Sequence, residues 1–194
     1  MRLPLDHFDL IARWYDRALG HPPDERLLRL LDARPGQRLL DIGGGTGRAT
    51  AMLAAAEVQV IVCDTSRRMA EQAQAKGLPV VLGSVTRLPF PTASAERLLV
   101  VDAFHHFVVP SPAVAQDAAA SELLRVLAPG GRLLIQEPDC TRRGVRPVIW
   151  MERVLMMGSR FLAPAEMTRM FETVGARQVA EERDHYNVWL VFTR

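Results

Sequence analysis

The sequence predicts an α/β protein built on a doubly wound, mostly parallel sheet. Short apolar segments alternate with helical segments through most of the 194 residues, and a glycine-rich turn follows the first apolar segment. The apolar segments scarcely alternate with polar residues, which is typical of parallel strands buried on both faces. The chain also ends in two strand-like segments joined by a turn. This ending predicts a hairpin that adds an antiparallel strand to the sheet.

The first 36 residues are expected to form a helical cover that precedes the sheet. Residues 7–19 ("HFDLIARWYDRAL") have helical spacing, which places Phe8, Ile11 and Tyr15 on one face. Residues 24–33 have the pattern of a second amphipathic helix. The cover and the sheet are expected to make up a single domain, residues 1–194.

Strands and helices are then expected to alternate, with right-handed crossovers between parallel strands. The expected strands cover residues 38–42, 58–64, 79–83, 97–103 and 131–138, and two more lie within 177–194 with a turn near 184–187. The expected helices cover residues 47–56, 66–77, 111–127 and 164–176.

The composition limits the classes of partner. A formal net charge of +2 is too small to favour a nucleic-acid partner. Cys63 and Cys140 are far apart and match no metal-ligand spacing, so no metal site is predicted. The N-terminal segment lacks the apolar region of a signal peptide, and no apolar run approaches the ~18 residues of a membrane span. These features predict a cytoplasmic protein without a membrane span.

The stretch "RLLDIGGGTGRAT", residues 38–50, predicts a ligand site. It places a glycine loop directly after the first strand, and ligands of doubly wound sheets bind at the carboxyl ends of such strands. Glycine allows close backbone approach, and the helix expected to begin near Gly47 would aim N–H groups at the ligand. The dinucleotide frame from Gly43 requires glycine or alanine where Arg48 stands. The observed spacing is instead Asp41-x-Gly43-x-Gly45-x-Gly47.

This spacing resembles motif I of the class I methyltransferases that depend on S-adenosyl-L-methionine (SAM). The resemblance extends to "VIVCDTSRRM", to "GSVTRLPFPTASAERLLVVDAFHHF" (83–107), to "ELLRVLAPGGRLLIQEP" (122–138) and to the terminal hairpin. The sequence is similar to small-molecule methyltransferases of type 11, and most of all to the ubiquinone/menaquinone methyltransferase group, whose opening the segment "FDLIARWYDRAL" also resembles. The resemblance implies a Rossmann-like sheet of seven strands.

The resemblance also implies a SAM site, with S-adenosyl-L-homocysteine (SAH) as the product. The glycine loop would wrap the methionine part, and Asp64, about 20 residues after it, would accept hydrogen bonds from the ribose diol. Ser84 stands where the family has an aspartate that bonds the adenine amino group, and loss of the charge costs ~1 kcal/mol. The residues expected at the cofactor are Tyr15, Asp41, Gly43, Gly44, Gly45, Asp64, Thr65, Ser66, Met69, Ser84, Val85 and Asp102.

Removal of a proton from the acceptor requires a general base, and two residues are candidates. His105 follows the fourth strand and Glu137 ends the fifth, both at the expected active edge. Each has an alternative role: "HH" suits a helix entry that packs on the core, and Glu137 suits a salt bridge or a cap over nearby backbone. Residues 139–163 lie where the family inserts a cover for the acceptor. Their Met-rich stretch fits either an apolar acceptor or a helix packed on the core.

The predicted function is therefore methyl transfer from SAM to a small, apolar or aromatic acceptor, by a monomer or homodimer. A non-catalytic SAM- or SAH-binding protein is the first alternative, because Ser84 replaces the usual aspartate and no base is obvious. An NAD-dependent oxidoreductase is the second, opposed by Arg48 and by the terminal hairpin.

Overall fold

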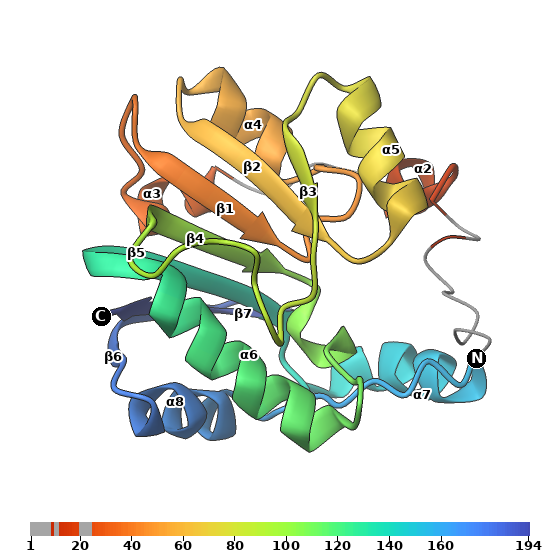
Figure 1. Cartoon of the computed structure of the whole chain (residues 1–194). Coiled ribbons are helices and arrows are strands. Elements are labelled where there is room, and N and C mark those ends of the chain that lie inside the picture. Colours follow the sequence, from red (N-terminus) through yellow and green to blue (C-terminus); the bar gives the residue numbers. More distant parts are fainter. Residues whose placement is uncertain (1–8, 10–11, 20–24) are drawn as a thin grey trace.

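Seven strands form one sheet in the order β3-β2-β1-β4-β5-β7-β6 in a computed structural model that describes residues 9, 12–19 and 25–194 (Figure 1). Pairing is parallel from β3 through β5, whereas β7 is antiparallel to both of its neighbours. The predicted doubly wound sheet with a C-terminal hairpin is confirmed. The strands are β1 (Arg38–Ile42), β2 (Gln59–Asp64), β3 (Val80–Leu82), β4 (Ala95–Val101), β5 (Leu127–Pro138), β6 (Arg177–Arg183) and β7 (Asn187–Thr193).

Helices cover both faces of the sheet (Figure 1). Alternate strand residues point to opposite faces. Leu39, Leu99 and Leu134 therefore lie in one apolar core with α3, α4 and α5, while Leu40 and Leu98 lie in the other core with α6 and α8. The helices are α2 (Tyr15–Leu19), α3 (Arg26–Leu31), α4 (Thr50–Ala55), α5 (Arg67–Ala75), α6 (Pro112–Val126), α7 (Arg146–Val154) and α8 (Pro164–Thr173), with short 3-10 turns η1 (Phe104–His106) and η2 (Arg143–Val145).

Several predicted boundaries were wrong, each for a local reason. The helix expected from Gly47 begins at Thr50, because Gly47 has a φ of +72°, which a right-handed helix does not allow. The strand expected to end at residue 103 ends at Val101, because Asp102 turns the chain with a φ of +50°. The strand expected from residue 131 begins at Leu127, which pairs with Ala95 of β4.

At the N-terminus, only part of the predicted cover can be compared with the structure. The predicted helix over residues 7–19 is represented by α2, and Phe8 and Ile11 lie outside the described residues. The predicted helix over residues 24–33 is present as α3.

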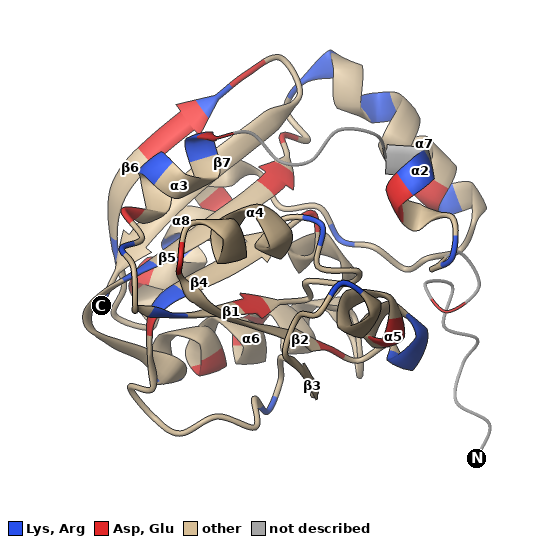
Figure 2. Cartoon of the chain, turned by 90° about the horizontal axis from the view of Figure 1, so that it is seen from above, with Lys and Arg blue, Asp and Glu red and all other residues tan. Residues whose placement is uncertain are grey.

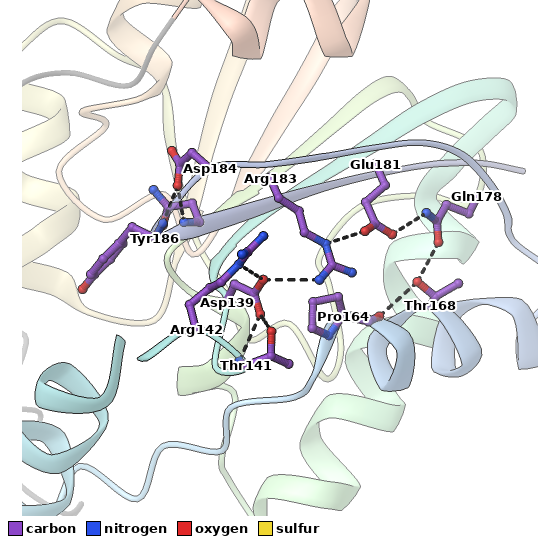
Figure 3. A network of polar contacts seen from close by, with 11 residues as sticks. Asp139, Thr141, Arg142, Pro164, Thr168, Gln178, Glu181, Arg183, Asp184 and Tyr186 are labelled. Atoms are coloured by element: carbon purple, nitrogen blue, oxygen red, sulfur yellow. Dashed lines mark hydrogen bonds and ion pairs between the residues drawn. The ribbon is translucent and has the colours of Figure 1, made fainter. Parts of the chain in front are cut away.

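A polar network fastens the terminal hairpin to the chain that leaves β5 (Figure 3). Asp139 is fully buried and accepts hydrogen bonds from the Thr141 amide and hydroxyl at 3.0 and 2.5 Å. It also pairs with Arg142 at 3.3 Å and with Arg183 of β6 at 3.4 Å. Burial raises the pKa of Asp139, but these partners outweigh it and lower the pKa below its usual value. The network fixes where residues 139–163 depart from the sheet.

Charges of both signs are spread over the described elements (Figure 2). Basic residues of α3 lie beside acidic residues of β6, and Arg29 donates two hydrogen bonds to Glu182 at 2.7 and 2.9 Å. This bidentate pair ties α3 to the edge strand. In the described part of the chain, none of the helices has the length and apolar character that a bilayer crossing requires.

Candidate cofactor and acceptor site

A cavity of about 910 Å³ lies at the carboxyl ends of β1, β2 and β4. The chain leaves β1 toward β2 on one side, and β4 pairs with β1 on the other, so the cavity is at the topological switch point of the sheet. Its volume is near the top of the range for small-molecule sites, about 300–1,000 Å³. Of the residues predicted at the cofactor, those on the cavity wall are Tyr15, Gly43, Gly45, Asp64, Thr65, Ser66, Met69, Ser84, Val85 and Asp102.

The glycine loop has no room for a side chain at Gly43 or Gly44. Gly43 has a φ of +72°, and a Cβ there would lie 2.7 Å from the Cβ of Ala103. A Cβ on Gly44 would lie 2.5 Å from Cγ of Asp41. Asp41 and Gly44, both predicted at the cofactor, are absent from the cavity wall: Gly44 is the loop residue that lies against the Asp41 carboxyl group.

Asp41 is a buried carboxyl group under the glycine loop. One oxygen accepts a hydrogen bond from the Thr50 hydroxyl, and the other has no hydrogen-bond partner among the described residues. Burial raises the pKa of Asp41 to about 7, and the nearby charge of Asp64 adds to this effect. Asp41 is therefore mostly neutral in the folded chain below about pH 7.

Ionisation of Asp41 is expected to destabilise the protein as the pH rises. The pKa of Asp41 is about 7 in the folded chain and about its usual value of 3.8 in the unfolded chain. The folded state therefore holds this proton more tightly than the unfolded state does. The resulting stabilisation is fully present below the unfolded pKa and is lost as the pH rises to the folded pKa. One pKa unit corresponds to ~1.36 kcal/mol, so the wild type should lose about 2–3 kcal/mol of unfolding free energy between pH 5 and pH 8 through this group.

Urea unfolding at both pH values measures this loss, which the Asp41→Asn variant should not show. Asp117→Asn, at an exposed position on α6, controls for a change of one charge. An equal loss in the wild type and in Asp41→Asn would contradict the assignment.

Asp64 ends β2 and faces the glycine loop across the cavity edge. One carboxylate oxygen accepts the Ser66 N–H at 2.8 Å, and the other accepts the Gly45 N–H at 2.8 Å. Each carboxylate oxygen can accept a second hydrogen bond, so Asp64 can hold the loop and also bind a pair of hydroxyl groups. Ser66 caps α5 by accepting the Met69 N–H at 3.2 Å and donates to Asp9 at 2.6 Å.

The short helix α2 closes one side of the cavity and is attached by three residues, which we call the cover clamp: Asp16, Thr46 and Lys76. Asp16 accepts hydrogen bonds from the Thr46 hydroxyl and from the Lys76 ammonium group, both at 2.5 Å. Lys76 also donates to the Thr46 carbonyl at 2.8 Å. The clamp brings Tyr15 to the cavity wall, where burial and the charge of Asp102 raise its pKa to about 12. Tyr15 is therefore a neutral phenol at neutral pH.

Asp102 lies on the cavity wall at the end of β4, in a left-handed conformation that aspartate tolerates better than most residues. Its carboxylate lies 3.6 Å from Arg48. Burial, with the nearby charge of Glu137, raises the pKa of Asp102 to about 6.

Glu137 and His105, the two candidates for the base, contact each other behind the cavity wall. Glu137 is 3% exposed and accepts N–H groups of Ala103 at 3.0 Å, Phe104 at 2.8 Å and His105 at 3.3 Å, which is the capping role left open above. Its Oε2 also lies 2.5 Å from Nδ1 of His105. Burial lowers the pKa of His105, but the charge of Glu137 outweighs it and raises the pKa to about 10. Their role as a base stays a prediction.

His106, which the sequence analysis did not select, lies on the cavity wall in place of its neighbour. Its Nδ1 is 3.0 Å from the Ser159 hydroxyl, and Glu152 of α7 lies near both histidine rings. Burial, with the charge of His105, lowers the pKa of His106 to about 3. The "HH" pair in the sequence indicated a histidine near the site. Which of the two rings faces the cavity depends on the turn of η1, which the sequence pattern does not give.

The Met-rich stretch was expected either to bind an acceptor or to pack on the core. Met156 and Met157 lie on the cavity wall together with Phe107. Most of the remaining apolar side chains do not pack on the core: the exposed ones are Trp150, Met151, Val154 and Leu155.

The chain is similar in sequence to known methyltransferases. Residues 40–135 match a family model described as a methyltransferase domain. A demethylmenaquinone methyltransferase from Beutenbergia cavernae is 39% identical over 142 residues, which are 67% of this chain and 55% of that protein. The chain spans about half the length of the curated relatives that it matches.

Solved structures share the fold at low sequence identity. A Haloferax volcanii protein in complex with the Trm112 methyltransferase activator has a TM-score of 0.76 at 17% identity, and the match covers 97% of each chain. A SAM-dependent methyltransferase from Aquifex aeolicus has a TM-score of 0.71 at 19% identity, over 95% of this chain and 97% of that one.

Proposed function

We propose that this chain, of which residues 40–135 match a methyltransferase domain, transfers a methyl group from SAM to a small, apolar or aromatic acceptor and releases SAH. The observation that carries the proposal is the cavity at the switch point, where Asp64 and the glycine loop face each other. The proposal includes a cytoplasmic location, a monomer or homodimer, and no nucleic-acid partner.

The cofactor half of the cavity has side chains suited to each part of SAM. Asp64 fits the ribose diol, since a carboxylate accepts from two hydroxyls. The neutral phenol of Tyr15 is a donor for the methionine carboxylate. Ser84, whose hydroxyl lies 2.9 Å from that of Thr86, is an uncharged acceptor for the adenine amino group. When bound, SAM supplies a methyl group already activated on a sulfonium.

The other half of the cavity supports an apolar acceptor. Phe107, Val108, Met156 and Met157 line it, and methionine side chains adapt to flat or irregular ligands. The Beutenbergia relative is named for a demethylated quinone, a ligand of this chemical class. These side chains would orient the acceptor and exclude water, which is much of what a displacement at an activated methyl requires.

His105 and Glu137 remain the candidates for removal of the acceptor proton. They form a close buried pair, and His106 is the adjoining residue on the cavity wall. A proton that reaches the pair from the acceptor would pass by way of water or a residue of the cavity wall, such as His106 or Asp102.

Calorimetric titration of the wild type with SAH tests the proposal, and we expect saturable binding of one SAH per chain that NADH does not displace. Incubation with SAM and a panel of hydroquinones and phenols should then yield a methylated product detectable by mass spectrometry. Displacement of SAH by NADH would favour the oxidoreductase alternative. Binding of SAH without turnover of any acceptor would favour the non-catalytic alternative.

A further inference from the structure

Three side chains next to the cavity form a compact set of metal-ligand atoms. His105 and His106 come from η1, Glu152 comes from α7, and one ligand atom of each lies within 4.8 Å of the other two. The Glu152 Oε1 atom is 3.5 Å from Nε2 of His105 and 3.9 Å from Nε2 of His106. Two segments 46 residues apart in sequence (106 to 152) thus meet at one point.

The second nitrogen of each histidine already has a partner that orients the ring. Nδ1 of His105 lies 2.5 Å from Glu137, and Nδ1 of His106 lies 3.0 Å from the Ser159 hydroxyl. Phe161 stacks on the His105 ring with the centroids 4.4 Å apart. Metal-bound histidines commonly have such a partner on the nitrogen that does not bind the metal, because it fixes the tautomer and the ring orientation.

The burial of the Glu152 carboxylate is a second observation, separate from the ligand distances, that supports a bound ion. The residue is 7% exposed, yet its Oε2 atom is buried without a hydrogen-bond partner among the described residues. A buried carboxylate oxygen without a donor is costly, and a metal ion that replaced the proton of the His105 ring would give this oxygen a partner.

The spacing also suits a metal better than direct hydrogen bonds. Hydrogen bonds between nitrogen and oxygen are about 2.7–3.2 Å long, and both Nε2–Oε1 distances exceed this range. Two ligands of a tetrahedral zinc ion, each about 2.0–2.2 Å from the metal, lie about 3.4 Å apart. Small side-chain shifts would bring both imidazoles and the carboxylate onto one ion.

We propose that His105, His106 and Glu152 bind one divalent transition-metal ion of the Zn²⁺ class. Two imidazoles and one carboxylate suit such an ion, and three protein ligands leave a coordination position open. Because His106 lies on the cavity wall, an acceptor oxygen is the group suited to that position. The ion would then ease loss of the acceptor proton by coordination. Only this last role rests on the proposed methyl transfer.

Metal content tests the proposal without any acceptor. Full-length protein treated with EDTA is dialysed against Zn²⁺ and analysed by mass spectrometry, and Co²⁺ is titrated while its visible absorption is recorded. We expect one ion per chain and an intense Co²⁺ band of low coordination number. His106→Ala and Glu152→Gln should each weaken binding at least tenfold. His185→Ala, an exposed imidazole outside the cluster, should leave it unchanged.

Three results would overturn the metal site: no stoichiometric ion, a Co²⁺ spectrum like that of the free ion, or unchanged affinity in Glu152→Gln. Glu152→Gln keeps the size of the side chain, and circular dichroism shows whether it folds, so the test stands even if His106→Ala misfolds. SAH binding by wild-type protein that takes up no metal would reject the metal site alone. Metal uptake without SAH binding would reject only the proposed function.

Discussion

The Asp64→Ala variant is expected to lose SAH binding, with affinity reduced by at least about 100-fold. A hydrogen bond to a charged group contributes about 1.5–3 kcal/mol, and the proposed ribose contact has two. Loss of about 3 kcal/mol corresponds to roughly 100-fold in affinity. Asp64 also accepts the Gly45 N–H at 2.8 Å, so its removal should loosen the glycine loop as well.

Calorimetry with SAH on Asp64→Ala and Asp64→Asn measures this loss. Asp64→Asn keeps one oxygen acceptor and should bind more weakly than the wild type but better than Asp64→Ala. Glu71→Ala, on the exposed side of α5 where Glu71 pairs with Arg67, is the matched loss of one acidic side chain and should bind normally. Wild-type affinity in Asp64→Ala would show that Asp64 does not contact the cofactor.

The Glu137→Ala variant is expected to lose about 3–5 kcal/mol of unfolding free energy, the range for removing one partner of a buried ion pair. Glu137 is 3% exposed, and its two oxygens accept three backbone N–H groups of residues 103–105 besides contacting the His105 ring. Its removal leaves those donors buried without an acceptor and leaves a space at the end of β5.

Urea unfolding with EDTA present separates this effect from any loss of metal. Glu137→Gln keeps the size but not the charge and should lose less than Glu137→Ala. Glu181→Ala, which removes a carboxylate paired with Arg183 on the exposed strand β6, should change stability by less than about 1 kcal/mol. A loss in Glu137→Ala as small as that in Glu181→Ala would mean that Glu137 does not hold η1 in place.

The sheet could be predicted because its signals are local. Leu39, Leu40 and Ile42 are apolar without alternation since both faces of β1 are covered, and this pattern is readable without tertiary information. The ligand site at the glycine loop could also be predicted, since a glycine loop directly after a strand of such a sheet implies one. Most residues predicted at the cofactor lie on the cavity wall, although their roles there are still predictions.

The acceptor side was less predictable because it depends on long-range contacts. His105 and His106 are neighbours in sequence, and only the turn of η1 decides that His106 reaches the cavity wall while His105 faces Glu137. Glu152 had no signal of its own, because its contacts with both rings arise only when α7 folds back toward η1. The start of α4 was misplaced for a different reason: the backbone conformation of Gly47 is not encoded by helical periodicity.

The cover clamp can be tested by amine chemistry. Lys76 is the only lysine in the sequence, and its ammonium group is held by Asp16 and by the Thr46 carbonyl. Acylation would remove the charge that Asp16 binds. Modification of this one side chain thus tests whether the clamp holds α2 in place.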